Sequence, residues 1–168
     1  MSRAFVKEDT EPAPLVPRRA PLPEGARNYV TPRGLALLRT ELERLRAELA
    51  GSERTADVSP GEAVALRVRI AELESRLSSA ELVDPTEGAP DVVRFGARVR
   101  VRLADGSERS YRIVGVDEAN VGEGRIAFVA PLARALLGRR IGDVVPWKTP
   151  RGEDEVEVVA IDFEPDSA

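Results

Sequence analysis

Acidic side chains gather in the stretch AGSERTADVSPGEAV, residues 50–64, which separates two segments of helical periodicity. Its carboxylates are those of Glu53, Asp57 and Glu62. Carboxylate oxygens are preferred ligands of Mg²⁺, and two-metal hydrolysis needs both of its ions held in place. Acidic residues also occur in exposed loops simply because water solvates them, and Glu62 is placed to cap a helix. The stretch is therefore either a working tip or an ordinary turn.

The composition excludes several kinds of catalytic site. The chain has no cysteine and no histidine, which excludes thiolate and imidazole zinc sites and nucleophilic catalysis by Cys–His or Ser–His pairs. The net charge of −4 argues against a general nucleic-acid binder, because such proteins carry a clear basic excess. We expect a specific protein partner, no metal site and no cofactor of the protein's own.

The beginning of the chain has the composition of an unstructured tail. Residues 1–28 contain five prolines and few apolar side chains, and proline removes backbone donors and disfavours regular structure. The same residues lack the apolar core of a secretory signal, and no apolar run approaches the roughly 18 residues of a membrane span. Since the absence of cysteine gives no sign of an oxidising compartment, we expect a cytoplasmic protein without membrane contact.

Two segments with a narrow apolar seam follow the tail. Thr31 suits an N-cap and Pro32 the first helical position, while Ser59 to Glu62 has the pattern of a capping box. Apolar residues recur at alternating spacings of three and four, as in a helix that faces one partner helix. The seam residues are Leu35, Leu38, Leu42, Leu45, Leu49, Leu66, Ile70, Leu73 and Leu77.

The two seams match in length, which predicts an antiparallel coiled-coil hairpin over residues 29–84 with its tip at 50–62. At about 1.5 Å per residue, each arm would project on the order of 28 Å. Such a narrow seam buries little surface, so the hairpin needs a base on which to stand. Pairing within one chain predicts a monomer, and self-association through the seams is the alternative.

After a linker at 85–90, the apolar period changes to that of β-strands. The string ARVRVRL alternates strictly, Asp105-Gly106 is a hairpin turn signal, and several further strand-like strings follow. Pro131 and Gly138 bound one short helical segment. Residues 91–168 are therefore expected to form a small antiparallel sheet with one short helix, and the fold class is α+β.

Several strings, in order, resemble the Gre family of transcription elongation factors. YVTPRGLALLRTELERL is similar to the start of the first coiled-coil helix in that family, and IAELESRLSSAELVD to the end of the second. FGARVRV, YRIVGVDEA, PLARALLGRRIGDVV and KTPRGEDEVEVVAI resemble successive pieces of the C-terminal domain. The resemblance implies a C-terminal domain with a fold like that of the FK506-binding proteins.

The resemblance also implies a function. Family members bind bacterial RNA polymerase, seat the C-terminal domain at the rim of its secondary channel and pass the hairpin toward the active site. In cleaving members, an Asp and a Glu at the tip help to hold the second catalytic Mg²⁺, and the polymerase then hydrolyses backtracked RNA. This chain would thus meet nucleic acid only within the elongation complex, and any Mg²⁺ would belong to the polymerase.

The tip departs from the family motif G-D-x-x-E-N-A-[DE]-Y. With Glu53 aligned to the catalytic glutamate, the catalytic aspartate falls on Ala50 and the tyrosine on Val58. The hairpin is also a few turns shorter than the usual arm of the family. We therefore expect a polymerase-binding factor that does not stimulate cleavage efficiently and is not an enzyme, with Glu53 and Asp57 as candidates for an altered role at the tip.

The polymerase contact of the family aligns with the start of the short helix, at Ala130, Pro131, Leu132, Ala133 and Arg134. Three alternatives stay open. The first is a true cleavage-stimulating factor that uses Glu53, and the second is the self-association module. The third is a prolyl isomerase, suggested by the fold family, although that activity needs an aromatic-lined pocket and the chain has only 4 Phe, 2 Tyr and 1 Trp.

Overall fold

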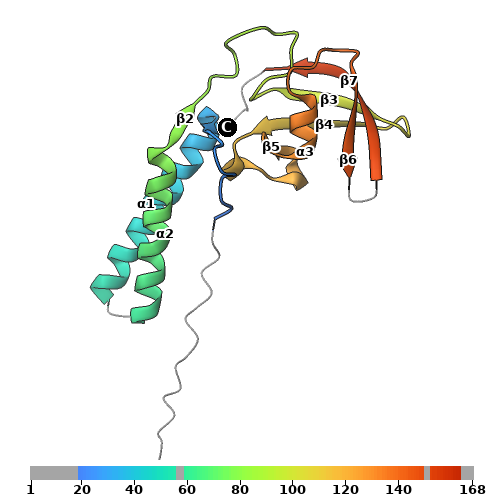
Figure 1. The fold of residues 1–168 in the computed structure, drawn as a ribbon. Helices are drawn as coiled ribbons and strands as arrows, with labels where there is room; N and C mark the ends of the chain where they lie inside the picture. The colour runs from blue at the N-terminus through green and yellow to red at the C-terminus, as the bar shows by residue number, and fades with distance from the viewer. Residues whose placement is uncertain (1–18, 56–58, 150–151, 164–168) are drawn as a thin grey trace, which may run out of the picture.

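The computed structural model describes residues 19–55, 59–149 and 152–163. A helical hairpin projects from one side of a small sheet domain, and one short helix packs on the sheet (Figure 1). The α+β class expected from the sequence is confirmed. Within the described residues, no helix has both the length and the apolar character needed to cross a membrane.

The hairpin consists of α1 (Pro32–Thr55) and α2 (Pro60–Ser78). Thr31 Oγ1 accepts a hydrogen bond of 2.9 Å from the backbone N–H of Gly34, which caps the start of α1. The seam leucines and isoleucine face one another between the helices. Leu38, Leu45, Leu66, Ile70 and Leu73 are buried in this cluster, and Leu35, Leu42, Leu49 and Leu77 pack against it half-buried.

The helices extend further into the expected tip than the sequence indicated. Because α1 continues to Thr55 and α2 begins at Pro60, most of the segment 50–62 is helical. Gly51 lies inside α1 and does not end it. A lone glycine weakens a helix by only about 1 kcal/mol, so the helix continues through this residue. Asp57 lies outside the described residues.

Two short strands at the base of the hairpin were not predicted. β1 (Asn28–Val30) precedes α1, β2 (Ala80–Leu82) follows α2, and they pair in parallel. Asn28 is buried, and its side-chain amide donates to the backbone carbonyl of Arg76 at 2.8 Å. The unstructured tail expected for residues 1–28 is therefore too long. Asn28 belongs to β1, and contacts with the rest of the protein begin at Arg19. Residues 1–18 lie outside the described part.

The sheet domain has five strands in the order β5-β4-β3-β7-β6. Its elements are β3 (Arg98–Leu103), β4 (Glu108–Val114), η1 (Val116–Glu118), η2 (Val121–Glu123), β5 (Arg125–Ala127), α3 (Pro131–Leu136), β6 (Val144–Thr149) and β7 (Gly152–Asp162). The expectation of a purely antiparallel sheet was wrong, since β5 pairs with β4 in parallel. The segment with the 3-10 helices η1 and η2 separates β4 from β5. It returns the chain to the start of the sheet edge, so that β5 runs in the same direction as β4.

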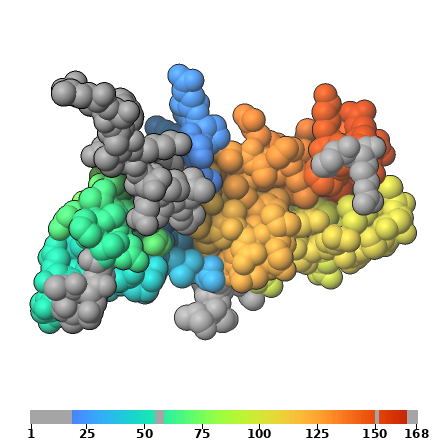
Figure 2. All heavy atoms as spheres, turned by 90° about the horizontal axis from the view of Figure 1, so that it is seen from below, coloured from blue at the N-terminus to red at the C-terminus, as the bar shows by residue number. Residues whose placement is uncertain are grey.

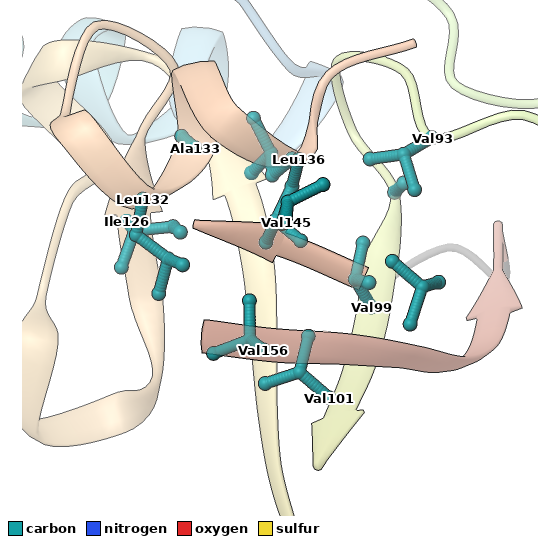
Figure 3. Close-up of a cluster of buried hydrophobic side chains, with 12 residues drawn as sticks. Val93, Val99, Val101, Ile126, Leu132, Ala133, Leu136, Val145 and Val156 are labelled. Atoms are coloured by element: carbon teal, nitrogen blue, oxygen red, sulfur yellow. The ribbon is translucent and has the colours of Figure 1, made fainter. Parts of the chain in front are cut away.

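The core of the domain lies between α3 and one face of the sheet (Figure 3). Val99 and Val101 of β3 are fully buried, whereas the arginines between them are exposed, as the strict alternation predicts. Leu132, Ala133 and Leu136 of α3 cover these valines. This packing holds the start of α3 in a fixed position at the surface.

Candidate functional site

At the tip, Glu53 is bound by an arginine of the opposite helix. Its Oε1 lies 2.8 Å from Nη2 of Arg67, and both side chains are more than half exposed. The neighbouring Arg54 turns back and donates from Nε to the carbonyl of Ala50 at 3.1 Å. The carboxylate therefore lies along the flank of the hairpin and closes its last turns through an ion pair between α1 and α2.

Glu62 serves the start of α2. Its Oε2 accepts hydrogen bonds from the hydroxyl of Ser59 at 2.8 Å and from the Ser59 backbone N–H at 2.9 Å. In return, the Glu62 N–H donates to Ser59 Oγ at 3.3 Å, which completes the capping box. The hydroxyl hydrogen bond, with that of the backbone, holds the pKa of Glu62 below its ordinary value. Glu62 thus has a structural role.

The described carboxylates of the tip are those of Glu53 and Glu62, and they do not converge on a common point. Across the described ranges, no group of three or more acidic side chains converges on one point. Hard divalent cations take several oxygen ligands, and one of the two carboxylate oxygens of Glu53 is already engaged by Arg67. The sequence pattern did not reveal Arg67 as a partner, because the ion pair joins residues of two different helices.

The start of α3 presents a mixed surface. Pro131 and Arg134 are exposed and Ala130 is half-buried, whereas Leu132 and Ala133 are buried in the domain core. Of the five residues aligned with the family's polymerase contact, Pro131 and Arg134 are therefore the ones that a partner can reach most directly. Leu132 and Ala133 support them from below, so a substitution there would disturb the fold first.

A polar joint connects the hairpin to the sheet domain. Glu118 in η1 has a side chain only 2% exposed. It accepts a hydrogen bond from the hydroxyl of Thr31 and pairs with Arg33 at 3.3 Å and with Arg125 at 3.2 Å. Thr31 and Arg33 belong to the base of α1, so a single buried carboxylate ties the two parts together. Sequence reasoning missed this residue because its partners on α1 lie more than 80 positions away.

Three aromatic rings add an apolar contact to the same joint. Tyr29 of β1 lies 5.8 Å from Phe95 and 5.5 Å from Phe128, measured between ring centroids, and Phe95 and Phe128 are 5.8 Å apart. Such tilted and edge-on pairs are favourable. These rings are occupied with fastening the hairpin to the sheet domain, which does not favour the isomerase alternative.

Known proteins are similar to this one over most of its length. The model of the family "Transcription elongation factor, GreA/GreB, C-term" matches residues 87–163. Transcription elongation factor GreA of Anaeromyxobacter sp. (strain K) is 36% identical over 151 residues, which are 80% of this chain and 91% of that protein. Transcription elongation factor GreB of Neisseria meningitidis serogroup A is 35% identical over 154 residues, 82% of this chain and 94% of the relative.

Among solved structures, a similar one is the GreA factor homolog 1 of Thermus thermophilus. It is 31% identical, and the alignment covers 82% of this chain and 99% of that chain with a TM-score of 0.40.

Proposed function

This chain belongs to the GreA/GreB family of transcription elongation factors, and from that premise we propose that it binds a bacterial RNA polymerase and acts through the secondary channel without efficiently stimulating transcript cleavage. In this proposal the sheet domain sits at the rim of the channel and the hairpin enters it. The protein acts as a monomer, because the two seams cover each other within one chain. It meets nucleic acid only within the elongation complex.

The observation that carries the proposal is the ion pair of Glu53 with Arg67, at 2.8 Å. A carboxylate that helps to hold a catalytic Mg²⁺ must direct its oxygens at the ion, and the positive charge of a bound guanidinium opposes the approach of a cation. Glu62 is occupied in the capping box, and Ala50 stands where the resemblance would place the second acid. The Mg²⁺ of the polymerase would thus find at most one carboxylate among these three positions.

The exposed residues at the start of α3 support the polymerase-binding half of the proposal. Pro131 fixes the first turn, and Arg134 presents a guanidinium from the same turn. A rigid helix start on a packed core loses little conformational entropy when a partner binds. We assign the polymerase contact to this surface, with Leu132 and Ala133 as its buried support.

The test is the rate of RNA cleavage in backtracked elongation complexes of the cognate polymerase, with and without the protein. We expect no acceleration, and we expect the protein to slow cleavage when a cleaving factor of the family is added alongside, because both would occupy one channel. Glu53→Ala should behave as the wild type. An acceleration by the wild type that Glu53→Ala abolishes would establish the alternative, a true cleavage-stimulating factor.

Binding to polymerase is tested separately with Arg134→Glu. Reversal of an exposed charge within the contact should weaken binding about tenfold or more, since close charge pairs across an interface contribute roughly 1.5 kcal/mol or more. Arg109→Glu, an exposed charge reversal on β4, is the matched control and should bind normally. Equal binding by both variants would remove the α3 surface from the proposal.

A further inference from the structure

The segment that precedes the hairpin touches both parts of the molecule. We call residues 19–27 the strap. One guanidinium nitrogen of Arg19 lies 2.8 Å from the Asp117 carboxylate, and the other lies 2.5 Å from that of Glu41. Asp117 belongs to η1 of the sheet domain and Glu41 to α1, so a single side chain bridges the two. In Figure 2 the blue N-terminal segment lies at the boundary between the hairpin and the sheet domain.

Arg76 of α2 completes the contact from the other helix. Its Nε lies 3.2 Å from Asp117 Oδ2, and its Nη2 donates a hydrogen bond to the backbone carbonyl of Ala20 in the strap. The Asp117 side chain is 6% exposed and that of Arg76 is 10% exposed. The carboxylate of the sheet domain is thus held between an arginine of the strap and an arginine of the hairpin.

These charges are largely out of water. Burial lowers the pKa of Arg19, but its hydrogen bonds and charge interactions with Asp117 and Glu41 outweigh burial and raise the pKa above its ordinary value. The Arg19 guanidinium is therefore a lasting positive charge, as arginine is in proteins generally. An ion pair that is mostly buried is screened little by salt, and loss of Arg19 would leave Asp117 to Arg76 alone and Glu41 without its partner in the strap. Loss of Arg19 should therefore change the geometry of the joint between the hairpin and the sheet domain.

The position of the contacts along α1 defines their mechanical effect. Glu118 binds the base of α1 at Thr31 and Arg33, and the contacts of Tyr29 and Arg76 also lie near the root of the hairpin. Arg19 binds α1 at Glu41, about 15 Å further along the axis at 1.5 Å per residue. A rod held at two points has a fixed direction. Because α1 is about 36 Å long, a rotation of roughly 10° at the base would move the tip by roughly 6 Å.

We propose that Arg19 is a positioning residue and that the strap sets the direction in which the hairpin leaves the sheet domain. The strap is part of the free protein, so this inference stands on its geometry without any partner. Its consequence for transcription, the aim of the hairpin tip within the polymerase, rests on the proposed function. The two statements are therefore tested by different measurements.

The first measurement is a distance between spin labels in the free, full-length protein. The chain has no cysteine, so Ala47→Cys on α1 and Ala104→Cys after β3, both at exposed positions, would be the only labelling sites. We expect a single narrow distance distribution in this background. Addition of Arg19→Ala should broaden or shift that distribution by several ångströms, while the helical content of the protein, measured by circular dichroism, stays unchanged.

Two further variants distinguish a change in the direction of the hairpin from a general loss of stability. Arg46→Ala removes an exposed ion pair with Glu74, 2.6 Å long, which joins the two helices without touching the sheet domain, and it should leave the distribution unchanged. Arg19→Lys keeps the charge but loses the fork that reaches two carboxylates, and it should restore the distribution in part. A distribution in Arg19→Ala identical to that of the parent would overturn the proposal, as would equal broadening by Arg46→Ala.

The second measurement concerns the partner. If Arg19→Ala changes the distance distribution and polymerase affinity falls with it, both the strap and the proposed function are supported. If the distance changes and neither the parent nor the variant binds polymerase, the proposed function fails while the strap stands. If the distance distribution is unchanged, the proposal about the strap is wrong, whether or not the protein binds polymerase.

Discussion

Glu62 and Ser59 show how much a pair of neighbouring residues can determine. The capping box is formed within four residues, so its geometry could be predicted from the string Ser59-Pro60-Gly61-Glu62 alone. Glu53 and Glu118 are the contrast. Their partners Arg67, Arg33 and Arg125 come from other elements, and no local pattern records which distant side chain will arrive. For this reason the sequence indicated the acids at the tip but not the arginine that binds one of them.

The capping box leads to a prediction about pH. The hydrogen bonds from Ser59 lower the pKa of Glu62 in the folded state. A carboxyl group whose pKa is lower when folded than when unfolded stabilises the fold above its unfolded pKa of about 4.3, and this contribution is lost as the pH falls through the folded value. Ser59→Ala should raise the pKa of Glu62 toward its ordinary value, and carbon NMR of the side-chain carboxyl measures it.

Asp105 provides the internal control for this titration. Its pKa is also lowered, chiefly by the hydroxyl of Ser107 in the turn after β3, and Ser59→Ala should leave it unchanged. A Glu62 pKa near 4.3 in the wild type would show that the capping box is not formed in solution.

The elements of the fold differ in how well the sequence predicts them. The two hairpin helices follow from the three-four spacing of the seam, because that spacing allows one buried stripe on a helix and nothing else. β1 and β2 have only three residues each, too few for a period to be visible. The parallel pairing of β5 depends on the path through η1 and η2, which no alternation of residues encodes.

The seam itself can be tested at Leu73. This side chain is fully buried between the helices, and Leu73→Ala should lower the free energy of unfolding by about 2–5 kcal/mol because it removes apolar contacts and leaves a cavity. Denaturant unfolding followed by circular dichroism measures the loss.

Val68 is the matched control on the same helix. It is 42% exposed on the side away from the seam, so Val68→Ala should change the free energy of unfolding by no more than about 0.5 kcal/mol. Similar losses for both variants would mean that α2 buries a different face in solution.

The molecule as a whole is two small cores joined by a polar and aromatic joint. The hairpin core and the sheet-domain core share no residue, and each is modest in size. Their connection runs through Glu118, the strap and the rings around Tyr29. Small units that bury limited surface depend on such connections for cooperative unfolding. We therefore expect the intact protein to unfold as one unit.

Tyr29→Ala should break that cooperativity. The change removes two ring contacts to the sheet domain, each worth about 0.5–1.5 kcal/mol beyond the burial of the ring. Calorimetry should then show two transitions, or one broadened transition, where the wild type shows one. Tyr29→Phe keeps the rings and loses only the hydrogen bond from Arg27, so it should unfold as the wild type does. A single sharp transition in Tyr29→Ala would place the coupling elsewhere in the joint.

The parallel pairing of β1 with β2 has a mechanical side. β1 leads directly into α1 at Val30, and β2 begins at Ala80, just after α2. In the register of the pair, Val30 lies opposite Leu82 and Ala80 lies opposite Asn28, so the ladder joins the start of one helix to the end of the other. The two helices can therefore separate at the root of the hairpin only if this ladder breaks.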